Sequence, residues 1–243
     1  MSPLKAVIFG AIGTIAETSD LQRQSFNAAF AEAGLDWHWS PALYQSLLQT
    51  NGGQERLREF RDADPARHRV SDATVERLHS AKTRHYVQLL QASNALEPRA
   101  GVAALVSLCL AKNIKLAWCT STSLDNVGGI QRALAGKLPL DRFDTIVTID
   151  KIKHAKPAPD AYVYALAQMG LEPHEVLAIE DTPVSIAAAK AAGIYCIATP
   201  GATTAEQDFS QADCVLKDLT ELDLAELGDL LLRNNPLSLA TAS

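Results

Sequence analysis

The second half of the chain alternates short strand-like runs with helical segments, and this alternation limits the fold more than any other feature. Strands that alternate with helices of about ten to fifteen residues are typical of a parallel sheet covered by helices on both faces. We therefore predict an α/β fold. The expected strands have the sequences IKLAWCT, DTIVTI, EVLAIED, IYCIATP and CVL.

An apolar run near the N-terminus, KAVIF, adds a further strand to this sheet. Between about Asp20 and Ala92 the apolar residues recur at helical spacing instead, so a helical lobe is expected to interrupt the core after its first strand. The ligands of such sheets bind outside the carboxyl ends of the strands. The predicted division is a core of residues 1–18 and 93–233, a cap lobe of residues 19–92, and a disordered tail of residues 234–243.

The charge and hydropathy of the chain exclude two classes of partner. The net charge is −6 and the 22 basic residues are scattered, which argues against a nucleic-acid surface. The densest basic group, Arg56, Arg58 and Arg61, is interrupted by Glu59 and is predicted to be a solvated helix face. No apolar run approaches the roughly 20 residues of a membrane span, and no charged-then-apolar leader precedes Val7.

The four cysteines show no C-x-x-C spacing. Cys119, Cys196 and Cys214 lie in strand-like runs and Cys109 lies in a helical run. Buried reduced thiols are favoured over disulfides or a metal site, which predicts a cytoplasmic protein.

Polar residues follow two of the expected strands. After IKLAWC come Thr120 and Ser121, whose hydroxyls and backbone N–H groups can form a small anion cradle or simply cap a helix. After DTIVTI comes Lys156, directly before a proline expected to start a helix. Its ammonium group can project toward a bound anion, although an exposed lysine is the equally simple alternative. His154 is predicted to lie on the surface.

A third strand end carries two adjacent carboxylates, Glu180 and Asp181. Ionised groups directly after a buried strand need a partner. Mg²⁺ is one candidate, and Lys156 from the neighbouring strand is another. We therefore predict a functional site at this edge of the sheet.

The loop after the first strand has the glycine-rich form of a functional turn but no chemistry at its tip. Gly10 and Ile12 can provide no acid, metal-binding or nucleophilic side chain, while Gly13 and Thr14 complete the turn.

Taken together, these motifs resemble the haloacid-dehalogenase-like (HAD) superfamily of phosphatases and phosphomutases, over nearly the whole chain. Thr120 matches the second family motif, Lys156 in KPAPD the third, and Glu180-Asp181 in IEDT the fourth. The capped subfamily is indicated, and within it the chain looks like the CbbY-type xylulose-bisphosphate phosphatases and the β-phosphoglucomutase-like proteins. The resemblance implies a Rossmann-like core, Mg²⁺ as cofactor, and a phosphorylated small molecule of the sugar phosphate class as ligand.

The first family motif is Asp-x-Asp-Gly-Thr, and here its two aspartates are replaced by Gly10 and Ile12. In the family the first aspartate attacks phosphorus and ligates Mg²⁺, and the second acts as general acid and base. Family-type activity is therefore predicted to be negligible, and Mg²⁺ binding through Asp181 and Glu180 to be weak or absent.

The resemblance also implies contacts between the cap and the substrate. Glu17, Gly53 and Arg56 match the family's substrate-recognition positions, whereas Gln22 stands where the CbbY type has His and Gln54 where it has Lys. Loss of the cation at position 54 is expected to weaken the grip on a second phosphate. The nearby Trp37 and Trp39 are predicted to pack inside the cap rather than to contact a ligand.

Three functions remain open at this point. The first is a phosphatase-like pseudoenzyme that binds a phosphorylated metabolite without turning it over. The second is an active hydrolase that uses water with Glu180 or Asp181 as base, because Thr14, Thr120 and Ser121 have no evident histidine partner. The third is a regulatory protein that binds a protein partner through its helical lobe.

Overall fold

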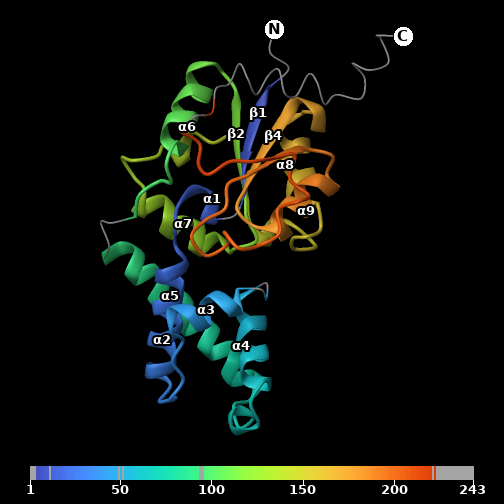
Figure 1. The fold of residues 1–243 in the computed structure, drawn as a ribbon. Helices are drawn as coiled ribbons and strands as arrows, with labels where there is room; N and C mark the ends of the chain where they lie inside the picture. The colour runs from blue at the N-terminus through green and yellow to red at the C-terminus, as the bar shows by residue number, and fades with distance from the viewer. Residues whose placement is uncertain are drawn as a thin grey trace. The chain divides into compact units, whose positions relative to one another are not determined.

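The computed structural model describes residues 4–10, 12–48, 50, 52–92, 96–220 and 222. The chain divides into two compact units, one formed by the residues up to Glu17 and from Leu96 onward, the other by Thr18–Ala95 (Figure 1). The first unit contains the sheet and the second is helical. The tail predicted at residues 234–243 lies outside the described residues.

The first unit is built on a parallel sheet, so the predicted α/β fold is confirmed. In the described residues the strand order is β3-β2-β1-β4-β5-β6, and every neighbouring pair is parallel. Phe9 at the end of β1 lies opposite Trp118 on one side and Ile179 on the other. The end of β1 therefore lies between the ends of β2 and β4. The strands are β1 (Ala6–Phe9), β2 (Lys115–Cys119), β3 (Thr145–Val147), β4 (Val176–Glu180), β5 (Tyr195–Ala198) and β6 (Cys214–Val215).

Helices cover both faces of this sheet, because its strands are mostly apolar on both faces. Successive side chains of a strand point to opposite faces. Ala6 and Ile8 belong to a core cluster with residues of α8 and α9, whereas Val7 and Phe9 are buried on the other face. Figure 1 shows α6 and α7 on that second side. The α-helices of this unit are α1 (Ile12–Ile15), α6 (Val102–Ala111), α7 (Leu124–Ala133), α8 (Asp160–Met169) and α9 (Pro183–Ala191), and its 3₁₀ helices are η2 (Leu140–Arg142), η3 (Ile149–Lys151) and η4 (Pro173–Glu175).

The second unit, the cap lobe, surrounds an aromatic core. Trp39 is fully buried, with its ring centroid 4.5 Å from that of Phe26, and its backbone N–H donates to Asn27. Trp37 packs edge-on against Phe30 in the same cluster. The prediction that both tryptophans pack inside the cap is confirmed. The helices are α2 (Ser19–Glu32), α3 (Pro41–Leu47), α4 (Gly53–Asp62), the 3₁₀ helix η1 (Pro65–Arg67) and α5 (Asp72–Ala92).

One helix begins later than its sequence indicates. Pro157 was expected to start a helix, but α8 begins at Asp160. The carboxylate of Asp160 accepts hydrogen bonds from the backbone N–H of His154, at 2.9 Å, and lies 3.1 Å from its Nδ1. These contacts close residues 154–160 into a turn that precedes the helix. The side chain of His154 is exposed, as predicted.

The cysteines are free thiols, in agreement with the sequence. Burial raises the pKa of Cys109 and of Cys119 to about 12, so both thiols are protonated and unreactive at neutral pH. In the part of the chain that the structure describes, no helix has both the length and the apolar character needed to cross a bilayer.

Candidate functional site

Four segments bring the predicted core residues to the carboxyl edge of the sheet. Gly10 follows β1, Thr120 follows β2, and Glu180 ends β4 with Asp181 directly after it. Lys156 lies in the segment between η3 and α8. Because β1 pairs with both β2 and β4, Gly10 lies at the centre of this group.

Lys156 and Glu180 form a buried ion pair. The Nζ of Lys156 lies 2.7 Å from Oε1 of Glu180, and the two side chains are 4% and 0% exposed. Lys156 also donates to the Tyr162 hydroxyl at 3.1 Å and to the Ser185 hydroxyl at 3.4 Å. A buried pair of this kind is tolerated only with good geometry and additional hydrogen bonds. The structure therefore selects Lys156, of the two partners considered from the sequence, as the partner of Glu180.

The carboxylate of Glu180 occupies the space of the missing side chain at residue 10. A β-carbon built on Gly10 would fall on the carboxyl group of Glu180, far inside van der Waals contact. The φ angle of Gly10 is not positive, so the backbone at this position does not require glycine. What excludes a larger residue at this position is the side chain of Glu180.

Asp181 is the second buried carboxyl group of the site. It is 7% exposed, and Oδ1 accepts a hydrogen bond from Thr14 at 3.2 Å. Burial, followed by the charge of Glu180, raises its pKa to about 7, although the positive charges of Arg99 and Lys156 act in the opposite direction. Asp181 is therefore partly protonated at neutral pH.

We expect Asp181→Asn to stabilise the protein above about pH 8. The folded state holds the proton of Asp181 more tightly than the unfolded chain does, so the parent loses stability as the pH rises from about 4 to about 7, and the loss is complete above that range. Asparagine cannot ionise and can still accept from Thr14. The gain should reach at most about 4 kcal/mol and should vanish below about pH 4, as measured by denaturant unfolding across this range.

Asp208→Asn is the matched control for this experiment. Hydrogen bonds from Ser210 lower the pKa of Asp208, so its replacement should give no stabilisation at high pH. An Asp181→Asn effect that does not change with pH would contradict the assignment of a raised pKa.

Arg99, which no sequence motif singles out, holds the loops of this edge together. Its guanidinium donates to the carbonyl oxygens of Gly13 at 2.9 Å, Thr199 at 2.7 Å and Pro200 at 2.8 Å. Its Nε lies 3.7 Å from Oε1 of Glu17. The glycine-rich loop after β1 is therefore tied to the loop after β5, and Glu17 is placed beside the same arginine.

The turn after β2 is ordered by its own hydroxyl groups. The backbone N–H of Thr120 donates to Val147, and the Thr120 hydroxyl accepts from the N–H of Thr122 at 3.2 Å. The amide of Thr120, which the sequence assigned to an anion cradle, is therefore used within the sheet. Ser121 is exposed at the edge.

In the cap lobe, Gln22 binds a lysine that the sequence did not single out. The Nζ of Lys82 donates to Oε1 of Gln22 and lies 5.1 Å from the ring centroid of Phe26. Lys82 is 5% exposed, and burial, followed by the charge of Arg56, lowers its pKa to about 7. Because Lys82 has an ordinary place in the amphipathic pattern of α5, its sequence position does not indicate that it is buried or that it binds Gln22.

Arg56 is a structural residue of the cap, not part of a solvated face as the sequence suggested. It is 9% exposed and donates to the carbonyl oxygens of Leu47 and Thr50, each at 2.9 Å. Its guanidinium also lies over the ring of Tyr44. The first turn of α4 contains Gly53 and the partly exposed Gln54. Arg58 pairs with Glu55, and Arg61 pairs with Asp62 and Asp72, carboxylates whose side chains are exposed.

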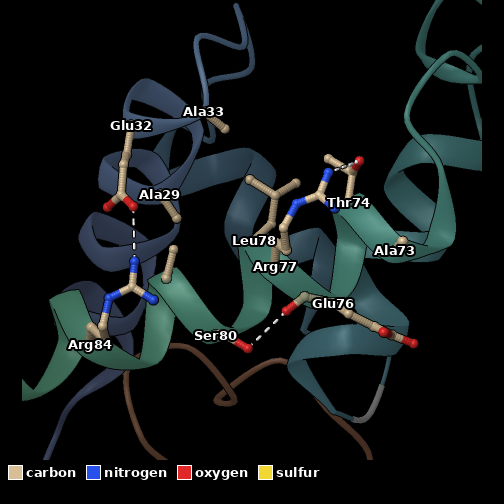
Figure 2. Close-up of a pocket in the computed structure, with 11 residues that line it drawn as sticks. Ala29, Glu32, Ala33, Ala73, Thr74, Glu76, Arg77, Leu78, Ser80 and Arg84 are labelled. Carbon is tan, nitrogen blue, oxygen red and sulfur yellow. Dashed lines mark hydrogen bonds and ion pairs between the residues drawn. The ribbon is translucent and has the colours of Figure 1, made fainter.

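A groove of about 760 Å³ lies elsewhere in the cap, between α2 and α5 (Figure 2). Figure 2 shows Glu32 of α2 paired with Arg84 of α5, at 2.8 Å. Small side chains such as Ala29 and Ala81 line its wall. None of the site residues predicted from the sequence lines this groove.

A parallel α/β core with an inserted helical lobe, and with lysine and paired carboxylates at the carboxyl ends of its strands, defines a phosphatase-like class of protein. Residues 4–193 match the family of haloacid dehalogenase-like hydrolases, and the chain belongs to this family. It is 41% identical over 220 residues to Protein CbbY of Rhodobacter capsulatus, covering 89% of this chain and 94% of the relative.

Solved structures agree with this assignment. CbbY from Rhodobacter sphaeroides, in complex with phosphate, has a TM-score of 0.81 and 36% identity, covering 90% of this chain and 96% of that one. A variant of the same protein in complex with xylulose-(1,5)bisphosphate has the same scores. A β-phosphoglucomutase-like protein from Thermotoga maritima, at 24% identity and a TM-score of 0.68, shares the fold.

The residues of this site do not fit the Mg²⁺ that the family generally uses. Mg²⁺ requires near-octahedral oxygen coordination. Gly10 provides no ligand side chain, and the Glu180 carboxylate is bound to the Lys156 ammonium. Within the described ranges, no three His, Cys, Asp or Glu residues are grouped so that they could hold a metal ion.

Proposed function

We propose that this protein binds a phosphorylated small metabolite of the sugar phosphate class and has lost the catalysis of its family. The observation that carries the proposal is the replacement of both first-motif aspartates, by Gly10 and Ile12, while Thr120, Lys156 and Asp181 remain. The relative from Rhodobacter sphaeroides binds xylulose-(1,5)bisphosphate, and this supports a sugar bisphosphate as the ligand class. Free buried thiols support a cytoplasmic location.

The loss of catalysis follows from the chemistry of the two positions. Gly10 has no atom that can attack phosphorus, and Ile12 has no proton to donate to a leaving group. Residues that act as a unit are strongly non-additive, and removing the nucleophile alone costs on the order of a millionfold in rate. The remaining Thr120, Ser121 and Lys156 are assigned to ligand binding.

Ligand recognition is assigned to the residues in and next to the cap that match family positions. Glu17 precedes the cap and is placed by Arg99. Arg56 acts by holding the loop at Leu47 and Thr50 rather than by direct contact. Gln54 is neutral where the family has a lysine, so the grip on a second phosphate is weak, and Gln22 stands in place of a histidine. The full set of recognition residues is Glu17, Gln22, Gly53, Gln54 and Arg56.

An active hydrolase that uses water is the second candidate function, and one observation favours it. The pKa of Asp181 is raised to about 7, which is the range in which a general base works best at neutral pH. Loss of turnover in Asp181→Asn, in a parent that hydrolyses phosphate esters, would establish this route. A regulatory function through the helical lobe would instead appear as a stable complex with a protein partner and no ligand in the site.

We expect inorganic phosphate to bind weakly and without a requirement for Mg²⁺. In an active relative the attacking carboxylate repels a phosphate dianion until a metal neutralises it. That carboxylate is absent at Gly10, and the Glu180 carboxylate that occupies its space is already neutralised by Lys156. Calorimetric titration of phosphate in EDTA and in Mg²⁺ measures this, with dissociation constants expected to agree within about threefold. A strict Mg²⁺ requirement would contradict the proposal.

A further inference from the structure

The hydrogen bonds of Lys156 leave none of its protons for a ligand. An ammonium group has three donors. In this structure they are directed at the Glu180 carboxylate, the Tyr162 hydroxyl and the Ser185 hydroxyl, at 2.7, 3.1 and 3.4 Å. The charge of Lys156 is also neutralised by Glu180 at the shortest of these contacts. An anion that binds Lys156 must therefore replace one of the three partners.

Glu180 is the partner whose position depends on a feature peculiar to this chain. Its carboxyl group lies where a β-carbon of residue 10 would be, so it can sit there only because residue 10 is glycine. Any side chain at position 10 would force Glu180 to another conformer. Tyr162 and Ser185 have no such dependence, since both belong to helices packed on the sheet.

We propose that Glu180 is a built-in ligand of Lys156 that keeps the anion site closed, and that the metabolite binds by displacing the Glu180 carboxylate. This inference rests on the proposed function, because it concerns the same phosphate ligand. Glu180 is then a determinant of affinity in this chain. The closed state follows from one residue, Gly10, and from its consequence, the inward conformer of Glu180.

Two variants that act differently should both open the site. Glu180→Gln removes the negative charge but keeps the size of the side chain and an oxygen that can accept from Lys156, which limits the cost to the fold. Gly10→Ala leaves all charges in place and displaces Glu180 by steric contact alone. Each should bind inorganic phosphate more tightly than the parent, by about tenfold or more for Glu180→Gln.

Glu175→Gln is the matched control. Glu175 lies directly before the same strand, at its opposite end, and pairs with Lys5 at 2.5 Å. Like Glu180→Gln, this substitution removes one carboxylate charge, but it lies outside the site, so the affinity for phosphate should not change. Lys156→Met should abolish binding. All variants are compared by calorimetric titration of inorganic phosphate in EDTA on the full chain, after thermal melts have shown that they are folded.

The outcomes separate the inference from the proposed function. Tighter binding in Glu180→Gln and in Gly10→Ala, with no change in Glu175→Gln, supports the closed-site inference. If the parent binds phosphate and both opened variants bind it equally or more weakly, the inference is overturned while the proposed function stands. If neither the parent nor any folded variant binds phosphate, the proposed function fails and the inference fails with it.

Discussion

With Mg²⁺ present, the purified protein should hydrolyse p-nitrophenyl phosphate and sugar phosphates about a millionfold more slowly than an active family member. The expectation follows from residues 10 and 12, which provide neither a nucleophile nor a proton donor. The ion pair of Lys156 also contributes to the low expected rate, because the lysine that should hold the transferred phosphoryl group is bound to Glu180.

The assay requires an active relative measured in parallel. Protein CbbY of Rhodobacter capsulatus, at 41% identity, is assayed for this purpose under the same conditions, and its own turnover is measured first. Release of inorganic phosphate is followed over hours so that slow turnover is detected. Turnover above roughly one per second, an ordinary enzyme rate, would contradict the assignment of lost catalysis.

The double variant Gly10→Asp with Ile12→Asp should gain Mg²⁺-dependent phosphatase activity. It rebuilds the first motif in a turn whose Gly13 and Thr14 are unchanged. The backbone at Gly10 permits the change, but the new side chain must expel the Glu180 carboxylate from its present position. Displaced from Lys156, Glu180 would also become available to a metal ion.

Single variants and an isosteric pair control this experiment. Each aspartate alone should do little, because a nucleophile without its proton donor leaves the set incomplete. Gly10→Asn with Ile12→Asn has the same shape and the same steric effect on Glu180 but offers no nucleophile, and it should remain inactive. Gln22 and Gln54 should keep the active double variant poor on bisphosphates. A folded double variant that binds Mg²⁺ yet hydrolyses nothing would show that the rest of the site has diverged as well.

The fold was predictable because its main signals are local. Apolar strand runs that alternate with helices define the parallel sheet, and the parallel sheet in turn places Gly10, Thr120 and Glu180 at one edge. Lys156 could be named as a partner of the carboxylates for the same reason. The sequence left two possible partners for the carboxylates, Mg²⁺ and Lys156. Only the side-chain geometry shows that Lys156 is the partner of Glu180.

The parts that could not be predicted depend on contacts between residues distant in sequence. Nothing in the sequence shows that Glu180 turns into the space beside Gly10, because this depends on the packing of β1 against β4. Arg99 gave no signal, since its partners are backbone carbonyl groups of three separate residues. Arg56 was assigned to a solvated face for the same reason: its acceptors, Leu47 and Thr50, are also backbone carbonyl groups.

The central claim, binding without turnover, is tested most directly by phosphorus NMR of xylulose-(1,5)bisphosphate mixed with a stoichiometric amount of the protein and Mg²⁺. We predict that the ligand resonances broaden or shift on binding, and that the compound is recovered intact after hours. Inorganic phosphate appearing at an ordinary enzymatic rate would contradict the loss of catalysis. Ligand resonances that stay unperturbed at millimolar concentration would contradict the assignment of a sugar bisphosphate ligand.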